Sequence, residues 1–124
     1  MTSRANERAK VLVVDDDPLW RDFLQTYLEA EGYRSVVAAN GREALTLLEQ
    51  EPCAVLLLDL RMPGMSGKDV VARLPAEGGP QVVFVTAAST EEVSAAMSGA
   101  PHYYLPKDAS PAELSLLLQA LEAH

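Results

Sequence analysis

Two of the most apolar runs in the 124-residue sequence end in acidic residues. The run VLVV is followed by Asp15, Asp16 and Asp17, and the run VLLL is followed by Asp59. A carboxylate is costly to bury alone, and like charges that lie close together raise one another's pKa. Asp17 precedes Pro18, which is typical of a helix N-cap. The other three carboxylates, of Asp15, Asp16 and Asp59, offer oxygen ligands, which suit a hard divalent cation such as Mg²⁺.

A hydroxyl and an ammonium group end two later apolar runs. Thr86 closes the run VVFVT, and Lys107 follows YYLP. Taken singly, Thr86 is a turn hydroxyl and Lys107 is a solvated surface charge. Beside an acidic cluster that holds a metal, they would instead offset the charge of a phosphoryl group, with Asp59 as the nucleophile. These residue types therefore indicate phosphoryl transfer to Asp59.

The elements that must position these residues alternate along the chain. Short apolar runs cover residues 11–14, 33–39, 54–58, 81–85 and 103–105. Segments with apolar residues at helical spacing follow them, over residues 18–31, 42–50, 68–74, 90–98 and 110–122. This alternation predicts an α/β fold with a parallel sheet covered by helices on both faces, in which ligands bind at the carboxyl ends of the strands. The second run contains Arg34 and Ser35 and is expected at an edge.

Composition narrows the possible functions. The net charge of -8 argues against direct binding of nucleic acid or of an anionic membrane. No apolar run approaches the roughly 18–20 residues that span a bilayer, and the N-terminus has no apolar segment of a secretory signal. Cys53 is the single cysteine, so no disulfide framework is expected. We expect a cytoplasmic protein with a disordered lead-in over residues 1–9 and one domain over residues 10–124.

Four motifs resemble those of the receiver domains of two-component response regulators. They are VLVVDDDP, LLLDLRMPGMSG, VVFVTAAS and YYLPKDASPAEL, which occur in that order. The resemblance covers Lys10 to Glu122. It implies a flavodoxin-like (βα)5 three-layer sandwich whose five-stranded parallel sheet has the order 2-1-3-4-5. It also implies that a sensor histidine kinase or a phosphotransfer protein is the partner that phosphorylates Asp59.

The resemblance assigns roles to the remaining site residues. It implies that Mg²⁺ is bound by Asp16, Asp59 and the backbone carbonyl of Arg61, with Asp15 helping through water. Thr86 and Lys107 would bind the phosphoryl oxygens.

A conformational switch is implied as well. Thr86 would move toward the phosphoryl group, and Tyr104, an aromatic residue of the fifth strand, would turn inward. Tyr103 is expected on the opposite face of that strand because side chains alternate along it. The face formed by the fourth helix, fifth strand and fifth helix would then control a downstream protein or an output domain.

The sequence departs from the family pattern in two places. Receivers commonly have proline directly after the lysine, joined by a cis bond, whereas here Pro106 precedes Lys107 and Asp108 follows it. We expect both the Leu105–Pro106 and the Lys107–Asp108 bonds to be trans. The fourth and fifth helices contain no Lys or Arg. The dimer of winged-helix regulators, which is joined by ion pairs on this face, is therefore not expected.

Three alternative functions agree less well with these residues. An aspartyl phosphatase of the haloacid dehalogenase type usually has a second acid two residues after its nucleophile, where this chain has Arg61. A flavodoxin-type cofactor carrier needs a phosphate-binding loop after its first strand, and the three aspartates would repel a phosphate there. A receiver-like interaction module that is never phosphorylated typically lacks an acid or the lysine, whereas this chain retains them all.

Overall fold

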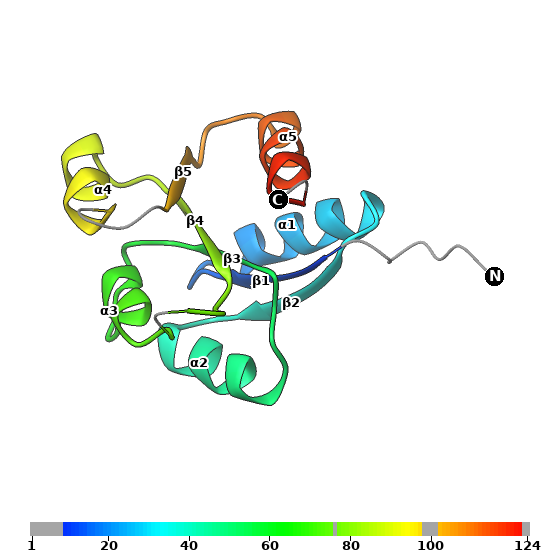
Figure 1. Ribbon diagram of the computed structural model, residues 1–124. Coiled ribbons are helices and arrows are strands. Elements are labelled where there is room, and N and C mark those ends of the chain that lie inside the picture. Colours follow the sequence, from blue (N-terminus) through cyan, green and yellow to red (C-terminus); the bar gives the residue numbers. More distant parts are fainter. Residues whose placement is uncertain (1–8, 76, 98–101, 123–124) are drawn as a thin grey trace.

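The computed structural model describes residues 9–75, 77–97 and 102–122, and strands and helices alternate along them (Figure 1). The strands are β1 Lys10–Val14, β2 Arg34–Ala38, β3 Val55–Leu58, β4 Gln81–Thr86 and β5 Tyr103–Pro106. The helices are α1 Pro18–Ala30, α2 Gly41–Gln50, α3 Gly67–Ala72, α4 Thr90–Met97 and α5 Pro111–Glu122. The predicted elements are all present. The predicted lead-in lies outside the described residues except for residue 9.

All strand pairs in the sheet are parallel, and their order is β2-β1-β3-β4-β5. The order confirms the predicted flavodoxin-like fold and the edge position of β2. Val14 pairs with Leu58, the last residue of β3, and Leu58 pairs with Phe84. Because these strands end at nearly the same level, the residues that follow β1 and β3 meet at one edge of the sheet.

Two apolar clusters cover the two faces of the sheet. Figure 1 shows α1 and α5 close together, and both pack on one face, around Leu28, Leu57 and Leu118. The other three helices pack on the opposite face, around Leu56 and Phe84. Every residue of β3 is buried, and so is every residue of β1 after Lys10. Burial on both faces explains why these strands read as continuous apolar runs in the sequence.

Local signals fix where the helices next to the sheet edge begin. The Asp17 side chain accepts a hydrogen bond from the Leu19 N–H at 3.0 Å, which confirms it as the N-cap of α1. A capping box between Ser66 and Asp69 begins α3. Gly67 follows Ser66 where the chain passes close to β3, and a Cβ at this position would lie 2.4 Å from the Asp59 carbonyl oxygen. Glycine is therefore required for this loop to pack against the end of β3.

The backbone near the end of β5 has ordinary geometry. No cis peptide bond occurs in the described parts of the chain, so the Leu105–Pro106 and Lys107–Asp108 bonds are trans as predicted. Within those same parts, no helix is both long enough and apolar enough to cross a membrane.

Candidate functional site

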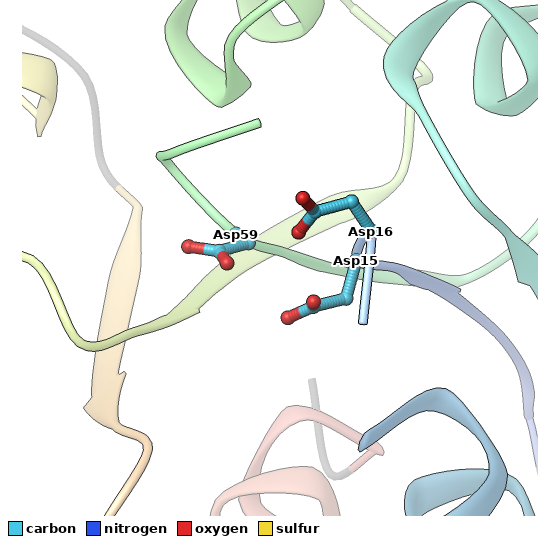
Figure 2. Close-up of side chains that lie close together, drawn as sticks. All are labelled: Asp15, Asp16 and Asp59. Atoms are coloured by element: carbon cyan, nitrogen blue, oxygen red, sulfur yellow. The ribbon is translucent and has the colours of Figure 1, made fainter. Parts of the chain in front are cut away.

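Three carboxylates come together where β1 and β3 end. One oxygen from each of Asp15, Asp16 and Asp59 lies within 4.8 Å of the others (Figure 2). Backbone hydrogen bonds extend the sheet past the strand ends, from the Asp15 N–H to Ala38 O and from the Asp59 N–H to Val14 O. Asp15 and Asp59 are buried, at 1% and 6% exposed, whereas Asp16 is exposed. The cluster is thus a shallow acidic site with two buried members and one facing solvent.

Asp15 is held from several sides. Its Oδ1 accepts the Asp17 N–H at 2.9 Å, and its Oδ2 forms an ion pair with Lys107 Nζ at 2.7 Å. The Arg21 guanidinium donates to the Asp15 carbonyl oxygen at 2.7 Å. Burial, with a smaller contribution from the charge of Asp59, raises the pKa of Asp15, although Lys107 and the Asp17 N–H oppose the rise. Asp15 is consequently a carboxylate whose charged form needs positive neighbours.

Lys107 supplies a positive charge to both buried carboxylates. Its Nζ lies 2.7 Å from Asp15 Oδ2 and 3.2 Å from Asp59 Oδ2. The same nitrogen lies 5.5 Å from the centroid of the Trp20 ring, within the range of a cation–π contact. Burial lowers the pKa of Lys107, but its contacts with Asp15 and Asp59 outweigh this, and the net pKa is raised. The lysine therefore stays protonated and binds the acidic cluster from the β5 side.

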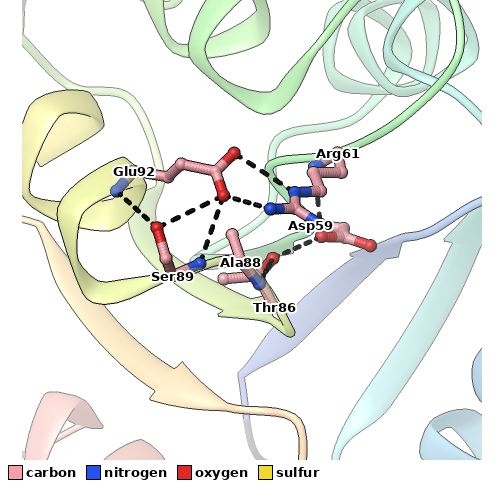
Figure 3. Close-up of polar contacts among 6 residues, drawn as sticks. All are labelled: Asp59, Arg61, Thr86, Ala88, Ser89 and Glu92. Carbon is pink, nitrogen blue, oxygen red and sulfur yellow. Dashed lines mark hydrogen bonds and ion pairs between the residues drawn. The ribbon is translucent and has the colours of Figure 1, made fainter.

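Thr86 completes the contacts of Asp59. Its side chain is fully buried, and its Oγ1 donates to Asp59 Oδ1 at 2.7 Å (Figure 3). The same Oγ1 accepts the Ala88 N–H at 3.1 Å, so the hydroxyl proton is directed at the carboxylate. The Lys107 N–H donates to the Thr86 carbonyl oxygen at 3.1 Å, which joins the ends of β4 and β5. Four strand ends therefore converge on Asp59.

The loop after β3 contributes through Arg61. Its backbone N–H donates to Asp59 Oδ1 at 3.2 Å, and its guanidinium pairs with Glu92 at the start of α4. The sequence did not predict this side-chain contact. The Ser89-to-Glu92 spacing of a capping box could have indicated where Glu92 points. That the Arg61 carbonyl binds a metal stays a prediction.

The two tyrosines of β5 face opposite ways. Tyr104 is half-buried and packs against the same apolar cluster as α4, whereas Tyr103 is 37% exposed. This confirms the predicted alternation along the strand. The role of Tyr104 in switching stays a prediction.

The acidic site fits the predicted cofactor. Its three clustered donors are all carboxylate oxygens, the kind of ligand that Mg²⁺ prefers, and the exposure of Asp16 leaves room for retained waters. The raised pKa of Asp15 shows that Lys107 alone does not fully offset burial and the neighbouring carboxylate. A second positive charge is therefore compatible with this cluster.

Comparisons with known proteins agree with this arrangement. The chain is 42% identical over 113 residues to a protein described as an uncharacterized 14.6 kDa protein in the sodA1 3′ region of Leptolyngbya boryana, covering 88% of this chain and 86% of that one. The chain is 36% identical to the DNA-binding response regulator MtrA of Mycolicibacterium smegmatis over a region that covers 91% of this chain. It spans only 50% of MtrA.

Solved structures show the same fold. The Francisella response regulator 1452 receiver domain superposes with a TM-score of 0.83 at 30% identity, covering 94% of this chain and 98% of that one. The Vibrio cholerae chemotaxis protein CheY4 superposes with a TM-score of 0.79 at 28% identity, covering 92% and 98%. The family model of the response regulator receiver domain matches residues 11–119. The chain therefore belongs to the receiver domain family of response regulators.

Proposed function

We propose that Asp59 accepts a phosphoryl group from the phosphohistidine of a sensor histidine kinase or phosphotransfer protein, in a reaction that depends on Mg²⁺. The observation that carries the proposal is the double contact of one carboxylate. Asp59 Oδ1 accepts a hydrogen bond from the Thr86 hydroxyl, and Asp59 Oδ2 accepts one from the Lys107 ammonium. The carboxylates of Asp15 and Asp16 also lie close to Asp59.

The transfer exchanges one bond to phosphorus for another. An Asp59 carboxylate oxygen forms a bond to phosphorus while the bond to the histidine nitrogen breaks, and the imidazole keeps that electron pair. Lys107 and Thr86 would bind the phosphoryl oxygens, which carry the charge in the transition state. Asp15, Asp16, Asp59 and the Arg61 carbonyl would hold Mg²⁺, which supplies further charge neutralisation when bound.

Phosphorylation would act on the β4–β5 side of the site. A phosphoryl group adds about -1.5 to -2 charges and three acceptor oxygens. The Thr86 hydroxyl would leave Asp59 Oδ1 for one of these oxygens, and Tyr104 would turn into the space beside it. The face formed by α4, β5 and α5 would carry this change to a downstream protein or an output domain.

The kind of output is a separate proposal. The chain spans about half the length of MtrA, whose name describes a DNA-binding regulator. With a net charge of -8, this chain is a poor candidate for binding nucleic acid itself. We expect its effect to pass through protein contacts.

Intact-mass measurement with acetyl phosphate as phosphoryl donor tests the proposal. With Mg²⁺ present, the wild type should gain the mass of one phosphoryl group, whereas Asp59→Asn should gain none. Removing Mg²⁺ with a chelator should abolish the adduct on the wild type. No adduct under any condition would favour the alternative, an interaction module that works without phosphorylation.

A further inference from the structure

The Arg61 guanidinium lies beside the predicted phosphoacceptor but is engaged elsewhere. It pairs with both carboxylate oxygens of Glu92: Nε lies 3.1 Å from Oε2, and Nη2 contacts Oε1 (Figure 3). Both side chains are largely exposed, at 63% for Arg61 and 45% for Glu92. The hydrogen bonds from the Arg61 guanidinium, followed by the one from the Ser89 N–H, lower the pKa of Glu92 to about 2. Glu92 is therefore ionised throughout the neutral pH range.

Glu92 also takes part in the cap at the N-terminus of α4. Its Oε1 accepts the Ser89 N–H at 3.2 Å, and its own N–H donates to Ser89 Oγ at 3.2 Å. These two bonds form a capping box, which satisfies N–H groups in the first turn of the helix. The ion pair with Arg61 thus joins the loop after β3 to the first turn of α4.

Arg61 also contacts Asp59 through its backbone, on the oxygen that Thr86 contacts. Asp59 Oδ1 accepts the Arg61 N–H at 3.2 Å and the Thr86 hydroxyl at 2.7 Å. Because the backbone of Arg61 is anchored to the carboxylate, a phosphoryl group on Asp59 would lie within reach of the arginine side chain. A guanidinium binds phosphate through paired N–H donors, whereas Lys107 supplies a point charge.

Resting on the proposed phosphorylation of Asp59, we infer that Arg61 is a second cationic ligand of the phosphoryl group and that Glu92 holds it away until that group arrives. The phosphoryl group carries more negative charge than Glu92 and adds three acceptor oxygens. The guanidinium therefore moves from Glu92 to the phosphoryl group. Glu92 keeps its bonds to Ser89, and the link between the β3–α3 loop and α4 is released.

The size of the effect follows from the exposure of the pair. Exposed ion pairs are weak and screened by salt, so the competition with Glu92 changes the affinity for a phosphoryl mimic by about two- to fivefold. An effect of this size is measurable as a ratio of dissociation constants. It should shrink as salt concentration rises.

Beryllofluoride with Mg²⁺, a mimic of the phosphoryl group, provides the binding test. Trp20 fluorescence reports binding because Lys107 Nζ lies 5.5 Å from its ring centroid. Glu92→Gln should bind the mimic about two- to fivefold more tightly than the wild type. Glu91→Gln removes the same charge from the neighbouring exposed residue and should have a clearly smaller effect. Equal effects of the two substitutions would overturn the inference.

A double-mutant cycle separates partner exchange from simple charge removal. Arg61→Ala removes an exposed side chain and retains the backbone N–H that contacts Asp59, and it should weaken binding by about two- to fivefold. In this background, Glu92→Gln should have no more effect than Glu91→Gln. An unchanged gain from Glu92→Gln would contradict the inference alone. Failure of the wild type to bind the mimic at all would instead overturn the proposed function, and the inference with it.

Discussion

The site has two halves that differ in how firmly they are held: the central strands β1 and β3, and the edge formed by β5 and α4. In β1 and β3, every residue except Lys10 is buried. In β5 no residue is fully buried, and in the described part of α4 the only buried residue is Val93. The half that presents the acidic cluster is thus a packed interior, whereas the half that presents Lys107 and Tyr104 is partly open. Local stability follows the density of buried contacts, so the second half is the better suited to move.

Lys107 connects the two halves, and Thr86 lies between them at the end of β4. Lys107 reaches from the end of β5 to Asp15 and Asp59, and Thr86 reaches from β4 to Asp59. A chemical change on Asp59 would therefore alter the contact that Lys107 makes from the partly open half. Under the proposed function, the first half would fix the geometry of the reaction and the second half would respond to it.

The largest effect should come from a deletion in the buried half. Leu57→Ala removes a side chain that is 1% exposed in the centre of β3 and should lower the free energy of unfolding by about 2–5 kcal/mol. Leu105→Ala makes the same change in β5, where the side chain is half-buried, and should cost about 1 kcal/mol. Denaturant unfolding measures both. Equal losses would contradict the difference between the halves.

A large kinetic effect should follow from removing the lysine that joins the halves. Lys107→Met removes the ammonium that contacts both buried carboxylates and should slow phosphorylation by acetyl phosphate about 10²–10³-fold. Lys68→Met, in the exposed first turn of α3, is the matched control and should leave the rate unchanged. The rate of phosphoprotein formation is the measurement. A loss of less than about tenfold in Lys107→Met would argue against its predicted role.

A smaller effect is expected from Asp15→Asn on the free energy of unfolding, measured as a function of pH. Burial raises the pKa of Asp15 in the folded chain, so the folded state binds this proton more tightly than the unfolded state. The resulting stabilisation is present below the ordinary carboxyl pKa and is lost as pH rises through the raised pKa. At pH 7 in metal-free buffer, the variant should therefore be more stable than the wild type by about 1 kcal/mol.

Added Mg²⁺ should reverse this order of stability, so that the wild type becomes more stable than Asp15→Asn. Lys107 still has Asp59 as a partner in Asp15→Asn, so the variant is not left with an unpaired buried charge. The wild type, which retains the acid, should gain more stability from added Mg²⁺ than the variant does. A variant that is less stable than the wild type at pH 7 without metal would contradict the pKa argument.

The smallest effect is expected on self-association. Among the described residues of α4 and α5, none is Lys or Arg, so cross-subunit ion pairs have no basic partner on these helices. Addition of beryllofluoride and Mg²⁺ should leave the molar mass measured by light scattering unchanged. A rise in molar mass to that of a dimer on addition of beryllofluoride and Mg²⁺ is the result that would refute this.

Local pattern predicted the parallel α/β sheet and the side chains that meet at its edge, whereas the resemblance to receiver domains supplied the strand order. Alternating apolar runs and helical segments predicted the parallel sheet, and the residues after each run predicted what meets at its edge. The contact between Arg61 and Glu92 could not be predicted in the same way, because it depends on how the β3–α3 loop and α4 pack in three dimensions. The close approach of Gly67 to Asp59 is likewise a packing feature with no periodic signal.

The most direct test of the account is to locate the phosphoryl group chemically. Borohydride reduces an aspartyl phosphate to homoserine, so peptide mass spectrometry of the phosphorylated and reduced protein identifies the modified residue. The account predicts homoserine at position 59 and at no other aspartate, with none in protein that was not phosphorylated. Homoserine at Asp15 or Asp16, or a stable phosphate on a serine, threonine or histidine with Asp59 unmodified, would contradict it.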